Sequence, residues 1–533
     1  MVLVEVLAGT VVVGASVVAA SVATGATVPA GSVGPVVAVS SPPHAPSTRV
    51  TTASAAAMRR DREVCGMDQR YAAPCHTAVV SAGSTPSHPF AGRPLPQWYD
   101  DAKFGIFIHW GPFTVPCFAP VNHNMGEMME AGDWAQAFRE SPYSEWYLNS
   151  WSLEGSSTAL HHAATYGDRT YASFVDEFHG RAAGFDIAHW ADLFVQAGAQ
   201  YVVPITKHHD GFLLWDSAVP NPHRDRWMAG RDFIAELATA VRAHGMRFGA
   251  YYSGGLDWTF EPPPIDSLMA MIQKIPTSPE YVEYATAHVR ELIDRFAIDV
   301  LWNDIAWPMT ADPNDIFGYY YDRVPHGVVN DRWNILAVRA GTLHADFSTP
   351  EYSTKADDVR KWEVCRGIGR SFGYNRMETE ATMPTVDDLV WMLVDIVARG
   401  GNLLLNVGPT ADGQIPLAQA VRLTGLGWWL RVNGAAIYGT RPWVRHSGTT
   451  ADGHDVRFTQ GAAGQVYAIV QGALAHEVRL PDVPVGEGTE IRMLGNDRVL
   501  PHTERVTEHG HELLVSLPDH LPAAPATVFE ISG

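Results

Sequence analysis

Two carboxylates of this chain come from different strand-like runs, in settings that suit catalysis. Asp304 follows the apolar run DVLW within LWNDIAWP, residues 301–308, and Glu351 lies near the end of ADFSTPEY, residues 345–352. Two such carboxylates among aromatic side chains and hydrogen-bond donors suit the hydrolysis of a glycosidic bond. One would attack the anomeric carbon, and the other, kept protonated, would give its proton to the leaving oxygen.

The same residues also suit roles outside this chemistry. Asp304 could cap the following helix or pair with Arg332, and Glu351 could be an ordinary surface residue. The segment HHDG, residues 208–211, could ligate a metal ion, although adjacent residues of a strand point to opposite faces. The residue types alone therefore indicate a barrel hydrolase that acts on sugars, without fixing its mechanism.

Polar or aromatic side chains end six successive apolar runs. Because the carboxyl ends of parallel strands meet at one rim of a barrel, we expect these residues to form one pocket rich in Trp. They are His109 and Trp110; His208, His209 and Asp210; Tyr251 and Tyr252; Trp302, Asn303 and Asp304; Asp331, Arg332 and Trp333; and Glu351.

The elements that would position these residues alternate along the chain. Continuous apolar runs are typical of strands buried on both faces, and helical patterns lie between several of them, at 186–199, 231–245, 279–296, 313–323, 385–399 and 415–432. This alternation predicts a (β/α)8 barrel, irregular where only residues 334–344 separate two runs. The eight runs are 103–111, 201–212, 247–255, 299–307, 327–333, 345–352, RSFGYN at 370–375, and 400–409.

The predicted barrel, residues 93–442, is flanked by two segments of different character. After Tyr438, short strand-like runs divided by turn residues predict an antiparallel β-sandwich over residues 443–533. Residues 1–92 are of low complexity. Their apolar stretch 6–26 could be a signal peptide or membrane anchor. The five residues before this stretch hold Glu5 and no Lys or Arg, however, so a disordered extension is an equal alternative. Location, exported or cytoplasmic, stays open.

The composition narrows the classes of partner. The chain has 533 residues, with 38 basic and 58 acidic side chains and a net charge of −20, so we expect no binding to nucleic acid. The four cysteines show no metal-type spacing, and Cys65 and Cys75 could pair if the segment that holds them is exported.

Nine motifs occur in a fixed order over residues 94–445: WYDDAKFGIFIHWGPFTVP, SEWY, ITKHHDGF, RFGAYYSGGLDW, VLWNDIAWP, NDRW, FSTPEY, SFGYN and GGNLLLNVGPTADG. In this order they resemble the motifs of the α-L-fucosidases of glycoside hydrolase family 29. The resemblance implies a retaining exo-glycosidase, a barrel followed by a β-sandwich, and no metal or organic cofactor. It also implies that Asp304 is the nucleophile. The acid/base falls on Glu351 of TPEY, with Glu363 as its rival and Glu378 as a weaker one.

The same resemblance implies the sugar contacts. The residues that would surround the sugar are His109, Glu145, Trp146, His208, His209, Tyr251, Trp302, Arg332 and Phe372. The three histidines, Glu145 and Trp146 would bind its hydroxyls, and Trp302 and Phe372 would form apolar walls for its methyl group. Tyr251 would lie near the nucleophile, and Arg332 would contact the sugar or the carboxylates. An insert with Glu127, Met128 and Met129 would shape the leaving-group side.

Two alternatives remain beside a fucosidase. One is a non-catalytic sugar-binding protein on the same scaffold, and the other is a metal-dependent barrel hydrolase that uses His208, His209, Asp210 and Asp304. The expected partner is a glycan or small fucoside with terminal α-L-fucose. Membrane contact is expected only if the N-terminal segment is an anchor, and the oligomeric state stays open.

Overall fold

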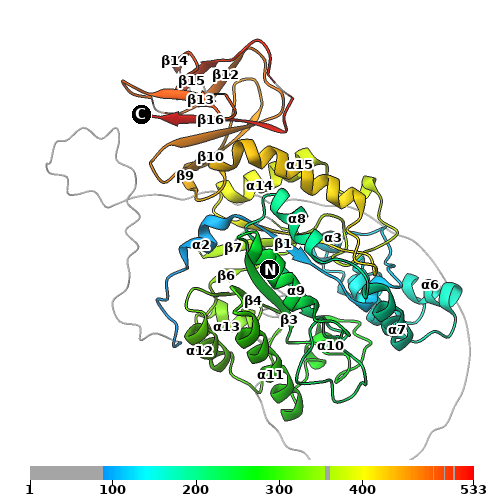
Figure 1. Ribbon diagram of the computed structural model, residues 1–533. Helices are drawn as coiled ribbons and strands as arrows, with labels where there is room; N and C mark the ends of the chain where they lie inside the picture. The colour runs from blue at the N-terminus through cyan, green and yellow to red at the C-terminus, as the bar shows by residue number, and fades with distance from the viewer. Residues whose placement is uncertain (1–87, 354–359, 484, 497, 508–509, 522) are drawn as a thin grey trace, which may run out of the picture. The chain divides into compact units, whose positions relative to one another are not determined.

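The computed structural model describes residues 88–533 except 354–359, 484, 497, 508–509 and 522. Its centre is an eight-stranded sheet of parallel pairs in the order β5-β4-β3-β2-β1-β8-β7-β6 (Figure 1). A parallel bridge between Asn330 and Phe347 joins its two edges, which confirms the predicted barrel. The strands are β1 (Phe104–Ile108), β2 (Tyr201–Lys207), β3 (Arg247–Ser253), β4 (Val300–Asp304), β5 (Val328–Val329), β6 (Phe347–Ser348), β7 (Lys361–Gly367) and β8 (Asn402–Val407).

The seventh strand differs from the prediction. Residues 370–375 are not a strand, and β7 is KWEVCRG, residues 361–367. The charged side chains of Lys361, Glu363 and Arg366 hide the apolar character of this run, although Glu363 is fully buried. The hydrogen-bond partners of the Glu363 side chain come from distant parts of the sequence, so a local pattern cannot show that this acid is buried.

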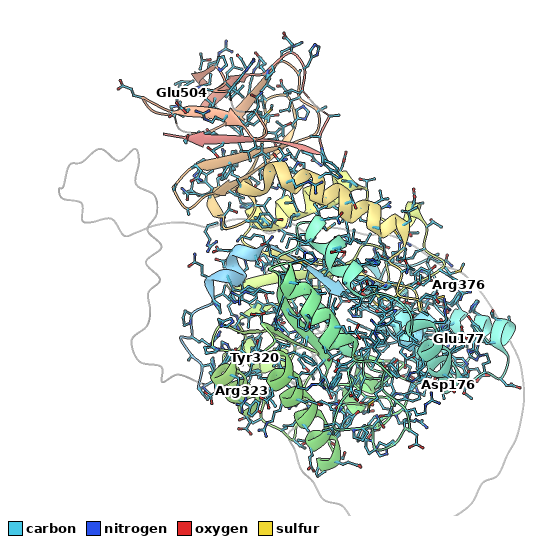
Figure 2. All side chains as sticks on the ribbon, viewed as in Figure 1. Asp176, Glu177, Tyr320, Arg323, Arg376 and Glu504 are labelled. Atoms are coloured by element: carbon cyan, nitrogen blue, oxygen red, sulfur yellow. The ribbon has the colours of Figure 1, made fainter. Side chains whose placement is uncertain are left out.

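The helices lie around the sheet where the sequence patterns put most of them. The predicted stretches correspond to α8 (Ala188–Gln196), α9 (Phe233–Ala243), α11 (Pro279–Phe296), α12 (Pro313–Arg323), α14 (Val386–Ala398) and α15 (Leu417–Asn433). In α9, Ile234, Leu237 and Val241 are buried as predicted, the Asp232 side chain accepts from the Ala235 N–H, and Gly245 follows with φ of 76°. Figure 2 shows charged side chains of the outer helices at the surface, among them Arg323 of α12.

The connection from β1 to β2 is long and holds a set of helices, of 5 to 12 residues, that the sequence patterns did not reveal. They are α3 (Met125–Glu130), α4 (Trp134–Arg139), α5 (Tyr147–Trp151), α6 (Ser157–Tyr166) and α7 (Tyr171–Ala182). Further short helices are α2 (Gln97–Ala102), α10 (Leu268–Gln273) and α13 (Ile335–Arg339). Side chains of α3 and α4, among them Met125 and Phe138, line a cavity at the barrel rim.

Two antiparallel sheets follow the barrel, orange to red in Figure 1. Their orders are β13-β16-β11-β10-β9 and β12-β15-β14, and one apolar cluster contains side chains of both, such as Phe458 and Leu513. They form the predicted sandwich. The strands are β9 (Arg441–Thr449), β10 (Asp455–Gln460), β11 (Val466–Gln471), β12 (Glu477–Pro481), β13 (Glu490–Met493), β14 (His502–Thr507), β15 (Gly510–Ser516) and β16 (Ala526–Ser532).

The described chain begins with side chains that pack on the barrel. The rings of Phe90 and Tyr321 pack with their centres 5.2 Å apart, and the Arg93 guanidinium pairs with the buried Asp346. The apolar stretch 6–26, Cys65 and Cys75 lie outside the described residues. Within the described part of the chain, none of the helices has the length and apolarity needed to cross a membrane.

Candidate active site

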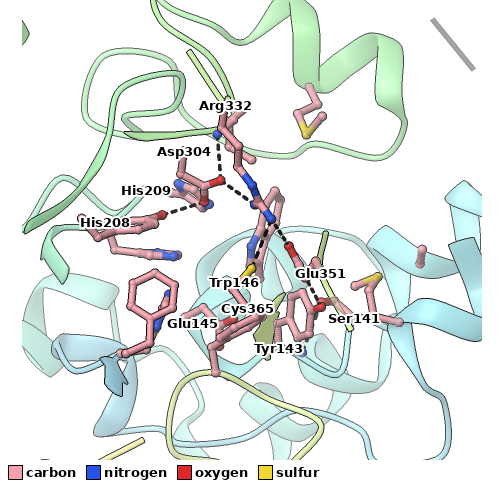
Figure 3. A pocket seen from close by; sticks show the side chains of 18 of the residues that line it. Ser141, Tyr143, Glu145, Trp146, His208, His209, Asp304, Arg332, Glu351 and Cys365 are labelled. Carbon is pink, nitrogen blue, oxygen red and sulfur yellow. Dashed lines mark hydrogen bonds and ion pairs between the residues drawn. The ribbon is translucent and has the colours of Figure 1, made fainter. Parts of the chain in front are cut away.

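A cavity of about 110 Å³ opens at the carboxyl ends of the barrel strands. It brings together all eleven residues expected to act on the sugar, as catalytic groups or as contacts: His109, Glu145, Trp146, His208, His209, Tyr251, Trp302, Asp304, Arg332, Glu351 and Phe372. Glu363, the rival acid/base, does not line it. Figure 3 shows the cavity with Asp304 and Glu351 on either side of Arg332.

Asp304 is the last residue of β4, and its carboxylate accepts three hydrogen bonds. The Tyr251 hydroxyl donates to Oδ2 at 2.8 Å, and the Arg332 Nη1 and the Ile305 N–H donate to Oδ1 at 2.9 and 2.8 Å. Burial by itself would raise the pKa of Asp304, but the charge of Arg332 and these hydrogen bonds outweigh burial and hold the pKa below its ordinary value. The carboxylate is therefore ionised at neutral pH.

The turn after Asp304 is strained. Ile305 has φ of 67°, a conformation that β-branched residues rarely adopt. Backbone strain of this kind persists where the surrounding structure over-determines it, and it gathers at functional sites. Here the strained backbone directs the Ile305 N–H toward the carboxylate of Asp304, which accepts a hydrogen bond from it.

Arg332 joins the two carboxylates. Its Nη1 lies 2.9 Å from Asp304 Oδ1, and its Nη2 lies 2.9 Å from Glu351 Oε2. The guanidinium is fixed further by Nε, which donates to the Thr349 hydroxyl at 3.0 Å, and by the Trp302 ring, 4.8 Å away. One rigid fork therefore sets the spacing of two groups that come from different strands.

Glu351 has a second donor on its other oxygen. The hydroxyl of Tyr143 donates to Oε1 at 2.6 Å, and a parallel bridge joins Glu351 to Cys365 of β7. The sequence patterns singled out neither Tyr143 nor Cys365. The signal for Tyr143 was its place two residues before Glu145, whereas Cys365 could be found only by recognising β7 as a strand.

Two histidines have tautomers fixed by their neighbours. The Asn406 amide donates to the Phe372 carbonyl, so its oxygen accepts from His109 Nδ1 at 2.7 Å. The Ser253 hydroxyl donates to the Leu256 carbonyl and accepts from His209 Nδ1 at 2.7 Å. Each ring is left with Nε2 as a hydrogen-bond acceptor.

Burial keeps these rings neutral. It lowers the pKa of His109 to about 4 and that of His209 to about 3, and it also lowers the pKa of His208. The buried Nδ1 of His208 has no partner among the described residues. Buried polar atoms are nearly always paired, so this nitrogen and the two Nε2 acceptors suit a ligand rich in hydroxyl groups.

Glu145 is a buried acid that also lines the cavity. Its Oε2 accepts from the Gly373 N–H at 2.8 Å and from the Ser371 hydroxyl at 3.3 Å. Burial raises the pKa of Glu145 to about 7 in spite of these donors. The carboxyl group therefore changes its charge close to neutral pH.

Glu363 lies beneath the cavity, in the interior of the barrel. The hydroxyls of Tyr99 and Tyr201 donate to its Oε2, at 2.8 and 2.5 Å, and the indole of Trp302 donates to its Oε1 at 3.2 Å. Burial raises the pKa of Glu363 to about 6. Its contacts are those of a group that positions Trp302. Glu378 lies outside the cavity too and accepts from the backbone of Arg370 and Ser371.

The segment HHDG does not form a metal site with its neighbours. Asp210 accepts from the Tyr171 hydroxyl at 2.7 Å and from the Phe212 N–H at 3.0 Å, which ties it to the turn below the cavity. Among the residues that the structure describes, no three His, Cys, Asp or Glu side chains are grouped as metal ligands would be.

A barrel with two bridged carboxylates at its strand ends has the architecture of a glycoside hydrolase site. The family model for alpha-L-fucosidase matches residues 77–435. Tissue alpha-L-fucosidase of Bos taurus is 34% identical over 468 residues, which cover 84% of this chain and 89% of that protein. The alpha-L-fucosidase of Dictyostelium discoideum is 34% identical over 422 residues, which cover 76% and 84%.

Solved structures agree with these relatives. A crystal structure of Thermotoga maritima alpha-fucosidase in complex with a mechanism-based inhibitor is 41% identical, with a TM-score of 0.73, over 82% of this chain and 96% of that one. The chain belongs to the α-L-fucosidase family, and it is a glycoside hydrolase. The comparisons lend no support to the non-catalytic and metal-dependent alternatives.

The raised pKa of Glu145 gives a pH-dependent prediction. Well below pH 7 the carboxyl group is protonated and, like the amide of Gln, is neutral and has a donor atom beside an acceptor oxygen. We expect Glu145→Gln to keep kcat/KM on an aryl α-L-fucoside within about threefold of wild type at pH 5.5. At pH 8.5 we expect a loss of about tenfold or more, the effect of a hydrogen bond to a charged group. Glu145→Ala, the control, should lose activity at both. Equal losses of Glu145→Gln at the two pH values would contradict the pKa.

Proposed function

We propose that the protein removes terminal α-L-fucosyl residues with retention of configuration, with Asp304 as nucleophile and Glu351 as acid/base. The observation that carries this proposal is the contact of Arg332 with both carboxylates. Retaining glycosidases need their two carboxyl groups only about 5–5.5 Å apart. A single guanidinium that binds one oxygen of each suits this short separation.

Charge conservation around Arg332 supports these two roles. Before reaction Asp304 is an anion and Glu351 carries the proton. When Asp304 attacks the anomeric carbon, its charge is lost in the ester, while Glu351 passes its proton to the leaving oxygen and becomes an anion. The net charge around Arg332 is unchanged, and the fork needs no rearrangement because it already touches both groups. In the second step Glu351 takes a proton from water, and the charge returns to Asp304.

The remaining cavity side chains suit fucose. The Nε2 acceptors of His109 and His209 and the unpaired Nδ1 of His208 can bind hydroxyl groups. Phe372 and Trp302 supply apolar surface for the methyl group, which has no hydroxyl to satisfy. The Thermotoga maritima relative has been solved in complex with fucose, and the same class of ligand fits the donors and acceptors of this cavity.

The nucleophile is tested by removing it. Asp304→Gly should lose turnover of an aryl α-L-fucoside by several orders of magnitude while the protein stays folded, because no group is left to form the ester. Azide should fit the space of the lost carboxylate, attack from the same face and give β-L-fucosyl azide, identified by NMR. Wild-type enzyme should release α-L-fucose first. Initial release of the β-anomer would contradict retention, and near-normal turnover by Asp304→Gly would exclude Asp304.

The acid/base is tested by comparing leaving groups. Glu351→Ala should lose far more kcat/KM on alkyl than on 2,4-dinitrophenyl fucosides, because kcat/KM reports the step in which the leaving group departs and only a poor leaving group needs the proton there. Glu363→Ala, the matched control, should lower the melting temperature, because it leaves the donors of Tyr99, Tyr201 and Trp302 unpaired. It should lose activity on both substrates to a similar degree. The assignment is wrong if the selective loss appears in Glu363→Ala and not in Glu351→Ala.

A further inference from the structure

One side of the cavity is apolar and comes from three short helices. Among the residues that line the cavity, α3, α4 and α10 contribute Met125, Trp134, Ala137, Phe138 and Met271. The Trp134 indole N–H is the one polar side-chain atom of this set, and it has no hydrogen-bond partner among the described residues. We call these five residues the apolar wall.

The apolar wall lies on the side of Glu351. Tyr143, which lies four residues after the end of α4, donates to Glu351 Oε1 at 2.6 Å. A side-chain carbon added to Gly126 of α3 would lie 4.0 Å from the Cβ of Tyr352, the next residue after Glu351. Because Glu351 would protonate the leaving oxygen, the group attached to that oxygen must extend toward these helices.

The wall is firmly packed from behind. Phe138 and Met271 belong to an apolar cluster with Leu256, Ile265 and Leu268, and they expose only 7% and 3% of their surface. Trp134, Trp146 and Ile305 pack against the same cluster. The wall therefore offers a fixed apolar surface that continues from the residue next to Asp304 to the helices beyond.

We propose that the apolar wall is a leaving-group subsite for an aryl or alkyl aglycone, so that the preferred substrates are hydrophobic α-L-fucosides. This inference rests on the proposed function, since it takes Glu351 as the acid. A sugar in the same place would present several hydroxyl groups to a surface with a single N–H donor, and unpaired hydroxyls oppose binding. An aromatic ring or alkyl chain would replace water on the wall without that loss, and the Trp134 N–H could donate to an ether or nitro oxygen.

The test compares substrates whose leaving groups differ only in apolar length. For wild-type enzyme, kcat/KM should be at least about tenfold higher for octyl than for methyl α-L-fucoside, the factor expected from burying two or three methylene groups. Octyl fucoside should also exceed α-L-fucosyl-(1→2)-galactose. A wild-type octyl-to-methyl ratio within twofold of one, or a preference for the disaccharide, would overturn the proposal without any variant.

Two variants locate the effect on the wall. Phe138→Ser and Met271→Ser lie on different helices, so a folding defect in one leaves the other informative, and in each the octyl-to-methyl ratio should fall to about threefold or less. Met269→Ser is the matched control on α10, because Met269 is 52% exposed and does not line the cavity. It should keep the wild-type ratio. An unchanged ratio in both wall variants would overturn the proposal.

A failure of the apolar-wall proposal can be distinguished from a failure of the proposed fucosidase function. α-L-Fucosyl fluoride has no aglycone and tests only the fucose site and Asp304. Wild-type enzyme that hydrolyses the fluoride but shows no octyl preference would refute the apolar wall alone. Wild-type enzyme that hydrolyses neither the fluoride nor any fucoside would refute both.

Discussion

The contact of Arg332 with Asp304 and Glu351 is the interaction on which the rest of the site depends. Three ionisable groups share a space where the Arg332 and Asp304 side chains are only 14% and 11% exposed. Breaking such a buried arrangement by removing one partner costs about 3–5 kcal/mol, because a charge is left uncompensated. The three groups come from successive strand ends, after β4, β5 and β6. The two shortest strands of the barrel, β5 and β6, thus lead into Arg332 and Glu351.

The layer beneath the cavity serves the same arrangement. The centre of the Trp302 ring lies 4.8 Å from the guanidinium carbon of Arg332 and 5.5 Å from the centre of the Tyr251 ring. The indole N–H of Trp302 donates to Glu363. Tyr251 in turn donates to Asp304. A chain of contacts therefore runs from Glu363 in the barrel interior, through Trp302 and Tyr251, to Asp304, the proposed nucleophile.

Sequence patterns predicted those parts of the fold whose signals are local. The bounds of α11 and α12 agree with the predicted stretches because an amphipathic pattern, a cap and a Pro near the first turn coincide there. Strand β7 was missed because the partners of Glu363, which are Tyr99, Tyr201 and Trp302, are distant in the sequence. The short helices α3 and α4 lack the length for a clear periodicity, so the apolar wall could not be foreseen from Met128 and Met129.

The candidate site was predicted in its residues and not in its connections. The strand-end rule and the motifs together singled out eleven of the residues that line one cavity, but not Tyr143, Cys365 or the apolar wall. On sequence grounds a pairing of Asp304 with Arg332 is an alternative to catalysis, and in the structure Asp304 both pairs with Arg332 and faces the cavity. That the same guanidinium also reaches Glu351 depends on the lengths of β5 and β6 and on the turns after them, which no local pattern encodes.

The central claim is that Asp304, held by Arg332, forms a covalent bond to the sugar. The most direct measurement is to incubate wild-type enzyme with 2-deoxy-2-fluoro-α-L-fucosyl fluoride, which leaves fluoride quickly and slows the second step, and then to sequence the labelled peptide by mass spectrometry. The account predicts one fluorofucosyl group per chain, attached to Asp304, and its release when turnover resumes. A label on Glu351 or Glu363, or rapid hydrolysis of a good leaving group with inverted configuration and no label, would contradict it.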